Sequence, residues 1–254
     1  MYEHEYDAMY RLEDSYWWYI ARRELAMELL KEEIRGRESI RILDVGCGTG
    51  ANIKDFGRLG PAIGIDSSVE ALHFCRSRGV GAVAMSRVED LPFAQGAFDI
   101  VTALDILEHT DDDLHCLREI RRVCARRGLL LITVPAYGFL WSEHDEALKH
   151  RRRYTAYELR NKLVLCGFEV VRTSYFITSL FFPILMFRIW NGLHKNSTHP
   201  RTSHYLLPKP INNALVGLLA LERKVFRQIN LPFGVSIVAL ARPVSDEALT
   251  VGKD

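Results

Sequence analysis

The sequence predicts an α/β fold in which helices cover both faces of a doubly wound, mainly parallel sheet. Between residues 40 and 135, short apolar runs alternate with stretches of helical pattern, which is typical of β-α-β units. A glycine-rich segment at 46–50 directly follows the first run, as expected where a strand turns into a helix beside a ligand. Hydrophobic residues make up 48% of the 254 residues and charged residues 26%, which predicts one large core and excludes wholesale disorder and a polytopic membrane protein.

Seven segments have the length and composition of strands. Each is a short run of apolar and β-branched residues between turn residues. They are 40–45, 62–65, 81–84, 98–103, 129–134, 168–176 and 235–241. The first five belong to the alternating region, whereas a long insert separates the sixth from the seventh.

Capping residues mark the predicted helix ends. Residues 67–70 and 155–158 each have the Ser/Thr-x-x-Glu spacing of a capping box, and the aspartates 111–113 favour the start of a helix that runs to about residue 124. Gly167 predicts a C-cap ahead of the sixth strand. Residues 21–34 carry leucines at helical spacing and predict an opening helix behind an aromatic segment.

The pattern divides the chain into four segments. Residues 1–37 form an N-terminal helical and aromatic cap, 38–176 the ligand-binding core, 177–234 an apolar and basic helical insert, and 235–254 the last strand with a C-terminal tail. At ~150 residues per domain, the length fits one domain with an insertion as well as two domains.

The insert combines an apolar stretch with an amphipathic helix. Residues 175–190 are almost wholly apolar but fall short of the ~20 residues that cross a bilayer, and residues 211–229 place apolar side chains on one helical face. Its basic residues are Arg188, Lys195, Arg201, Lys209, Arg223, Lys224 and Arg227, against one acid, Glu222. Two interpretations stay open: a helical lid on the core, or peripheral contact of 177–229 with an anionic membrane or lipid substrate.

Charge and cysteine content restrict the partners. Thirty-three basic and 32 acidic residues leave a net charge of +1, which predicts no nucleic-acid partner. Five cysteines without a C-x-x-C pair predict neither a disulfide framework nor a zinc site, so no metal ligands are expected. The acidic, aromatic N-terminus is not a secretory signal, and a cytoplasmic location is expected. Both a monomer and a homodimer fit.

The glycine-rich turn and a later carboxylate indicate a nucleoside-bearing cofactor. A hydrophobic strand runs into Gly46, Gly48 and Gly50 at the start of a helix, where unpaired N–H groups are available. Asp66 ends the second strand, where a carboxylate can accept from both ribose hydroxyls. The turn also satisfies the dinucleotide-binding fingerprint, so it does not by itself separate a nicotinamide enzyme from other users of the fold.

Four segments in one order, LDVGCGTG, GIDSS, EDLPF and FDIVTALDILEH, resemble the class I S-adenosylmethionine-dependent methyltransferases. The resemblance covers residues 38–176, recurs at 235–241, and is nearest to the small-molecule branch with quinone-biosynthesis and related lipid-methylating enzymes. It implies a Rossmann-like sheet of seven strands, the last inserted antiparallel beside the sixth. It also implies S-adenosyl-L-methionine as cofactor and a small or lipid-linked acceptor.

The resemblance further implies cofactor contacts, residue by residue. The turn after the first strand would line the methionine end of the cofactor, and the end of the second strand would contact the ribose and the adenine edge. A later loop would contact the adenine ring, and the end of the fourth strand would contact the methionine ammonium. In that order the residues are Asp44, Gly46, Cys47 and Gly48; Asp66 and Ser67; Val88 and Glu89; and Leu104 and Asp105. Arg87 departs from the family pattern, which commonly has an aspartate there to accept from the adenine amino group; arginine has no acceptor.

Methyl transfer from a sulfonium is an in-line displacement, so the protein contributes alignment and a base where the acceptor is a hydroxyl. His109, His144 and His150 follow the fourth and fifth strands and are the candidate catalytic residues, because imidazole titrates near neutral pH. A structural hydrogen bond is the alternative role for each of them.

Two groups of residues are candidates for substrate binding. A run of arginines after the fifth strand could pair with a carboxylate or phosphate, or could be a solvated charge run. The N-terminal aromatic segment could fold over the cofactor as a lid, or pack the first helix against the sheet. The candidates are Tyr16, Trp17, Arg22, Arg151, Arg152, Arg153 and Tyr154.

The leading interpretation is therefore an S-adenosylmethionine-dependent methyltransferase. An NAD-dependent oxidoreductase would share the glycine turn and Asp66, but Asp44 at the strand end and the lack of a Tyr-x-x-x-Lys set disfavour it. A non-catalytic cofactor-binding module is the remaining alternative, since a fold does not imply a function.

Overall fold

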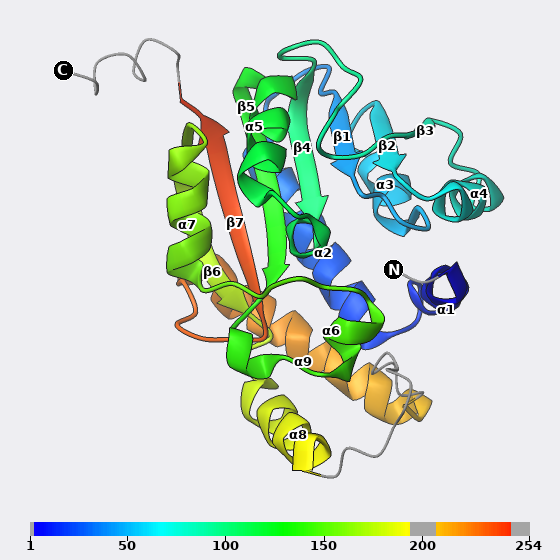
Figure 1. Ribbon diagram of the computed structural model, residues 1–254, viewed down its shortest axis with the longest axis vertical. Helices are drawn as coiled ribbons and strands as arrows, with labels where there is room; N and C mark the ends of the chain where they lie inside the picture. Colours follow the sequence, from blue (N-terminus) through cyan, green and yellow to red (C-terminus); the bar gives the residue numbers. More distant parts are fainter. Residues whose placement is uncertain (1–2, 194–206, 245–254) are drawn as a thin grey trace.

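The computed structural model describes residues 3–193 and 207–244. Its centre is a seven-stranded sheet in the order β3-β2-β1-β4-β5-β7-β6 (Figure 1). The strands are β1 (Ile42–Val45), β2 (Ala62–Asp66), β3 (Val83–Met85), β4 (Phe98–Leu104), β5 (Cys124–Pro135), β6 (Phe168–Phe176) and β7 (Ser236–Pro243). Strands β1 to β5 are parallel, and β7 runs antiparallel to both β5 and β6. The predicted sheet, including its antiparallel last strand, is confirmed.

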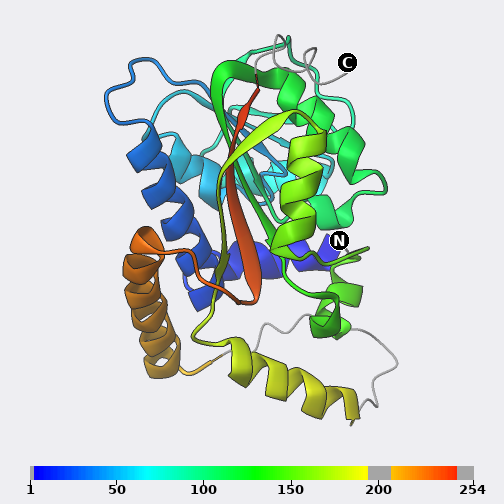
Figure 2. The ribbon, with the colours of Figure 1, turned by 90° about the vertical axis from the view of Figure 1, so that its left-hand side faces the viewer.

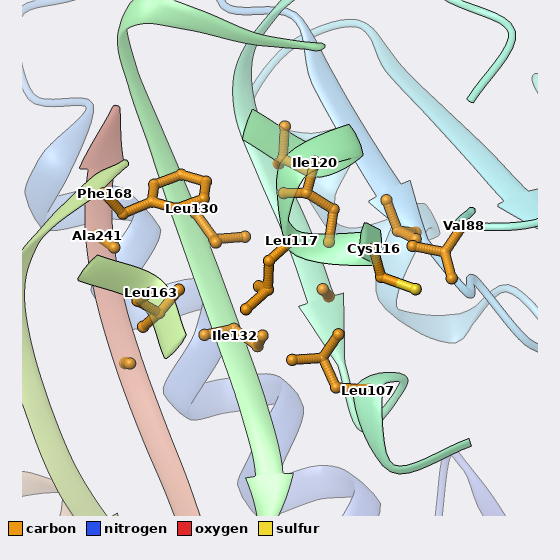
Figure 3. Packing of buried hydrophobic residues seen from close by; sticks show 14 of the residues in the cluster. Val88, Leu107, Cys116, Leu117, Ile120, Leu130, Ile132, Leu163, Phe168 and Ala241 are labelled. Atoms are coloured by element: carbon orange, nitrogen blue, oxygen red, sulfur yellow. The ribbon is translucent and has the colours of Figure 1, made fainter. Parts of the chain in front are cut away.

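Helices cover both faces of this sheet (Figures 1 and 2). They are α1 (Glu3–Leu12), α2 (Trp17–Glu33), α3 (Ala51–Phe56), α4 (Val69–Ser77), α5 (Asp113–Val123), α6 (Glu143–Ala147), α7 (Ala156–Leu165), α8 (Phe181–Leu193) and α9 (Lys209–Gln228). On one face, α5 and α7 bury Leu117, Ile120 and Leu163 against Leu130 and Ile132 of β5 (Figure 3). On the other face, α2 and α9 pack on the opposite side of the same strands. Because both faces are covered, β1, β4 and β5 are almost continuously buried, as their apolar sequences require.

Two of the predicted helix starts are confirmed and two are wrong in detail. Thr155 and Glu158 form the capping box of α7, with the Glu158 N–H donating to Thr155 Oγ1 at 3.2 Å. Asp112 caps α5 by accepting from a backbone N–H. The cap of α4 is Ser68 rather than the predicted Ser67, because Ser68 Oγ accepts from the third residue after it. Likewise α2 begins at residue 17, so the aromatic segment is part of the opening helix rather than ahead of it.

Helix α9 is part of the core rather than a separate basic face. It lies along α2, and it buries Leu219 and Phe226 while leaving Val225 exposed, which differs from the face predicted from periodicity. Ion pairs accompany this packing: Arg223 is turned inward to acidic residues of α2, with its NH1 2.5 Å from Glu24, and Arg227 pairs with Glu32 of the same helix. The predicted basic residues Lys195 and Arg201 lie outside the described residues.

No helix in the described ranges 3–193 and 207–244 is both long enough and apolar enough to traverse a bilayer. The five cysteines are all buried, and none of them is in a disulfide bond.

Candidate functional site

A cavity of about 590 Å³ opens at the carboxyl edge of the parallel strands. Strand order reverses there: β1 is flanked by β2 on one side and by β4 on the other, so the connections leaving β1 and β4 run in opposite directions. In open α/β sheets such a switch point leaves a crevice in which ligands bind. The volume falls in the usual range of small-molecule sites, ~300–1,000 Å³. The carboxyl edge of the sheet, where the sequence predicts the cofactor, therefore contains a cavity.

The glycine turn between β1 and α3 forms one wall of the cavity. Gly46 has φ +73°, and a Cβ atom there would lie 1.8 Å from Ile106 Cδ1, so a side chain at this position would strain the backbone and displace Ile106. Gly48 and Cys47 line the cavity beside it. The backbone of this turn thus faces the space directly, as the sequence predicts for a close-approaching ligand.

Asp66 is fixed in the cavity wall at the end of β2. Its Oδ2 accepts from the Gly48 N–H at 3.0 Å, and its Oδ1 accepts from the Ser68 N–H at 2.9 Å. Burial raises the pKa of Asp66, although these backbone N–H groups act in the opposite direction. The exposed Ser67 and, from α1, Tyr6 lie beside it in the same wall. The Asp66 carboxylate is therefore oriented by the glycine turn, the same turn that the sequence analysis places beside it in the cofactor site.

The loop after β3 provides the wall next to Asp66. Val88 is buried and Glu89 lines the cavity. Arg87, the departure from the family pattern, also lines the cavity, and its NH2 lies 3.1 Å from Glu89 Oε1. Because Glu89 supplies an acceptor beside Arg87, the pair presents both a donor and an acceptor where arginine alone presents only donors.

Asp44 lies behind the glycine turn rather than in the cavity wall. It is 1% exposed, and Thr102 Oγ1 donates to its Oδ1 at 2.6 Å, while its Oδ2 has no hydrogen-bond partner among the described residues. Burial raises the pKa of Asp44 to about 7. A buried carboxylate oxygen without a donor is costly, so a cationic or N–H-bearing ligand next to this turn would be stabilised by it.

Asp105 follows β4 in a strained conformation. Its φ of +58° is unusual for a residue with a side chain. Thr133 Oγ1 donates to its Oδ1 at 3.0 Å, and Arg22 of α2 forms a short ion pair with its Oδ2. The neighbouring Leu104 lines the cavity too. The Asp105 carboxylate is thus held from two sides, by Thr133 of β5 and by Arg22 of α2.

The N-terminal segment serves both roles that its sequence allows. Tyr16 and Trp17 are buried in the core and do not line the cavity, whereas Trp18, Tyr19 and Arg22 do. The Arg22 guanidinium lies 4.4 Å from the Trp18 ring centroid, a cation–π contact that holds it over the cavity.

Helix α1 is a part of the site that the sequence analysis missed. Tyr6, Met9 and Glu13 line the cavity, and the buried Glu13 accepts from Thr49 of the glycine turn and from Arg78 of the α4 C-terminus. The segment is short and polar, and its role depends on contacts with residues far along the chain. No local pattern marks it.

The three candidate histidines meet at the opposite end of the cavity from Asp66. The ring centroids of His109 and His150 are 4.7 Å apart, and those of His144 and His150 are 6.3 Å apart. His150 Nδ1 lies 2.9 Å from Asp145 Oδ1. Although burial opposes it, His150 and Arg153 hold the pKa of Asp145 well below its usual range. An ionised carboxylate can only accept a hydrogen bond, so His150 Nδ1 donates to Asp145. In the neutral imidazole the other nitrogen, Nε2, then has no proton and keeps its lone pair.

Glu108 joins this group as a residue the sequence analysis missed. It is fully buried, neither carboxylate oxygen has a hydrogen-bond partner among the described residues, and it lines the cavity. Single ligand atoms of Glu108, His109 and His150 all lie within 4.8 Å of one another. Two imidazoles and one carboxylate can hold a divalent cation, and Asp145 would orient His150 from behind as outer-shell carboxylates do. The expectation of no metal ligands therefore overlooked a group that only the fold brings together.

The arginine run is divided by the fold. Arg151 is half exposed and lines the cavity, with its NH1 2.5 Å from Asp111, while Arg153 is buried in the wall and bound to Asp145. Arg152 and Tyr154 point away from the cavity, and both bind Asp113 at the start of α5. They contact α5 because the chain alternates direction through an extended segment. Arg188 of α8, which the sequence analysis names among the basic residues of the insert and not among the site residues, also lines the cavity.

Comparisons with known proteins relate part of the chain to methyltransferases. Residues 43–132 match the family model described as a methyltransferase domain. A ubiquinone biosynthesis O-methyltransferase of Xanthomonas oryzae pv. oryzae is 34% identical over 100 residues, which are 37% of this chain and 42% of that protein. The chain spans about half or less of the length of several curated relatives that it matches.

Solved structures share the fold. Phosphoethanolamine N-methyltransferase 2 of Haemonchus contortus, in complex with S-adenosyl-L-methionine, has a TM-score of 0.57 at 18% identity, covering 86% of this chain and 52% of that chain. The [4+2]-cyclase SpnF has a TM-score of 0.55 at 23% identity, covering 87% of this chain and 81% of that chain. Since one similar structure is a methyltransferase and the other a cyclase, the fold alone does not fix the reaction.

Proposed function

We propose that this chain is an S-adenosylmethionine-dependent methyltransferase that moves a methyl group to a small or lipid-linked acceptor by in-line displacement. The observation that carries the proposal is one continuous cavity with two chemically different ends. The glycine turn and Asp66 line one end, and the histidines with Glu108 line the other. A cofactor at the first end would present its methyl group toward an acceptor at the second.

The residues at the first end fit S-adenosylmethionine. The Gly46 turn leaves room for close backbone approach, and Asp66 offers a carboxylate to ribose hydroxyls. Asp44, which lies behind the turn, would act on a bound ammonium through its charge rather than by direct contact. Leu104 and Asp105 would complete the methionine end, and Val88 with Glu89 would contact the adenine ring. When bound, the cofactor supplies an electrophilic methyl group on a sulfonium.

His150 is the residue best placed to accept a proton from an acceptor hydroxyl. Its Nδ1 is held by Asp145, which leaves Nε2 free as the base and stabilises the imidazolium that forms. His109 is a weaker base, because burial and the neighbouring His150 lower its pKa to about 3. His109 then serves with Glu108 to position the acceptor. A cation held by Glu108, His109 and His150 would occupy the His150 lone pair and would take the place of His150 as the base.

A lipid-linked acceptor is supported by helix α8. The same helix that sends Arg188 into the cavity leaves Phe182, Met186 and Ile189 exposed on its outer side. An apolar chain attached to the acceptor would lie against these side chains while the reactive group enters the cavity. Peripheral contact with a membrane would occur at this face of the insert.

Calorimetric titration tests the cofactor assignment. We expect S-adenosylmethionine and S-adenosylhomocysteine to bind at micromolar concentration and NAD not to bind. Binding of NAD alone would favour the oxidoreductase alternative. A protein that binds the first two ligands but transfers no methyl group to any phenolic or amine acceptor would instead be a cofactor-binding module.

A further inference from the structure

One cation in the acceptor end of the cavity lacks a full partner. Arg188 NH1 is buried and has no hydrogen-bond partner within the described ranges of the chain. The nearest carboxylate oxygen, Asp145 Oδ2, is 3.8 Å away, which is beyond hydrogen-bond distance. The side chain is 15% exposed and lines the cavity. A buried guanidinium in this state is rare, because burial of an unpaired charge is costly.

Asp145 cannot serve as the missing partner, because other donors already fill it. Its Oδ1 accepts from His150 Nδ1 and from Arg153 Nε, and its Oδ2 accepts from Arg153 NH2 and from both the N–H and the hydroxyl of Ser142. A carboxylate has about four lone-pair sites. Two guanidinium groups thus share one saturated carboxylate, so Asp145 has no lone-pair site left for Arg188.

The neighbouring Arg151 and Arg153, unlike Arg188, are bound to carboxylates at short distance. Arg153 is 2% exposed and uses its remaining NH1 on the Ala136 carbonyl at 2.9 Å, so it belongs to the scaffold. Arg151 is paired with Asp111 at the cavity mouth. Burial, and then the charge of Arg153, lower the pKa of Arg188 to about 10, as expected for a cation that lacks compensation. Arg188 is therefore the group available to a ligand.

Arg188 lies at the acceptor end rather than the cofactor end. Along the carboxyl edge the strands follow the order β2, β1, β4, β5 and β7. Asp66 ends β2, whereas Arg188 faces Asp145, which belongs to the segment after β5. Figures 1 and 2 both show α8 beyond the carboxyl end of β5, close to α6. The cofactor and this guanidinium thus occupy different halves of the cavity.

We propose that Arg188 binds an anionic group, a carboxylate or a phosphate, on the methyl acceptor and so selects acidic acceptors. The inference rests on the proposed function, because it assigns the substrate class of the same site. A guanidinium matches both anions through paired N–H donors. The insert would then take part in recognition through α8, with the anion held inside the cavity and the apolar remainder of the acceptor against the outer side of the helix.

Three probes of similar size test the inference: benzoate, phenyl phosphate and the neutral benzamide. Each is titrated calorimetrically into protein saturated with S-adenosylhomocysteine. We expect at least one anion to bind tenfold or more tightly than benzamide, and Arg188→Gln to remove that preference, with Arg188→Lys retaining part of it. The anion that binds more tightly identifies the source as carboxylate or phosphate. The control Arg160→Gln, at an exposed position on α7, leaves the preference unchanged.

Two measurements separate this inference from the proposed function and from a structural role. Affinity for S-adenosylhomocysteine should stay within about twofold in Arg188→Gln; an equal loss there would mean that Arg188 binds the cofactor carboxylate instead. The melting temperature of the ligand-free variant should be unchanged or higher, because the substitution removes an uncompensated buried charge. A lower melting temperature, or equal affinity for anions and benzamide in the unsubstituted protein, would overturn the inference. Failure to bind S-adenosylhomocysteine would count against the proposed function itself.

Discussion

Single carboxylates around the cavity differ in how many donors each one has. Asp145 accepts from five donor atoms and Asp66 from two backbone N–H groups, whereas Asp44 has one donor and Glu108 has none among the described residues. Donors stabilise the ionised form, and burial without donors disfavours it. Asp145 is therefore held in its charged form, the backbone N–H groups at Asp66 oppose the effect of burial on its pKa, and the charge of Asp44 and Glu108 depends on what binds beside them.

Asp66→Ala tests the cofactor end. We expect affinity for S-adenosylhomocysteine to fall by about tenfold or more, since the substitution removes a charged acceptor worth ~1.5–3 kcal/mol. Asp90→Ala, at an exposed position of a nearby loop, is the matched control and should bind normally. Equal affinity in the two variants would remove Asp66 from the cofactor site.

Asp44→Asn tests the buried acid through pH. The folded protein raises the pKa of Asp44 from 3.8 to about 7, so between these values the folded state holds a proton that the unfolded state releases. The free energy of unfolding should therefore decline with rising pH across this window, by up to ~1.4 kcal/mol per unit from this group. Urea denaturation at several pH values should show a shallower decline in Asp44→Asn. Parallel profiles would mean that Asp44 titrates normally.

Glu108→Gln tests the metal-binding capacity of the histidine group. Dialysis against Co²⁺ followed by absorption spectroscopy should show uptake of about one ion per chain in the unsubstituted protein, and none in the variant. The exposed Glu70→Gln on α4 is the control. Uptake that persists in Glu108→Gln would place the ion elsewhere.

Several of the residues that the sequence predicted at this site share a simple property: they stand at strand ends. Gly46, Asp66 and Asp105 follow directly from strands whose apolar patterns are plain, and parallel strands bring their ends together. Glu108 also follows a strand, but its significance depends on His150, forty-two residues later, and on the absence of a donor. Arg188 required knowledge of which side of α8 faces inward. Such long-range contacts leave no local pattern.

Whole elements decide how the cavity is enclosed. Helix α1 covers one side through Tyr6 and Met9, and it is anchored at its end by Tyr10, which stacks on Phe74 of α4 with ring centroids 4.7 Å apart. Its sequence places Tyr6, Met9 and Tyr10 at helical spacing, in agreement with a helical cap, but its position over the cavity depends on contacts with distant residues and could not be predicted. Helices α5 and α7, by contrast, were predicted because their caps and leucine spacing are local signals.

Removal of residues 1–12 tests the contribution of α1. The truncated chain should keep its sheet and its circular dichroism spectrum, but release S-adenosylhomocysteine several-fold faster, because one cavity wall is lost. Stopped-flow displacement measures the rate. Arg11→Ala, on the exposed side of α1, should release the ligand at the normal rate. An unchanged rate in the truncated chain would show that α1 does not enclose the ligand.

At the scale of the whole molecule, the two helices of the insert present different surfaces. The arginines of α9 are neutralised by acids of α2, while the outer side of α8 is apolar. We therefore expect co-sedimentation with phosphatidylcholine–phosphatidylglycerol vesicles to depend on α8 and to respond weakly to salt. The double variant Met186→Glu, Ile189→Glu should lose it. Retention in the supernatant at low salt would exclude contact through this face.

The position of β7 has a consequence for synthesis on the ribosome. Within the described sheet, β6 is hydrogen-bonded only to β7, and β7 also occupies one edge of β5. Until residues 236–243 have left the exit tunnel, β6 has no neighbour and the edge of β5 stays open, although every other strand has been made. Open apolar edges attract other chains. The nascent protein therefore exposes an edge that can pair with other chains until β7 is made, and β7 completes the sheet from within rather than at its border.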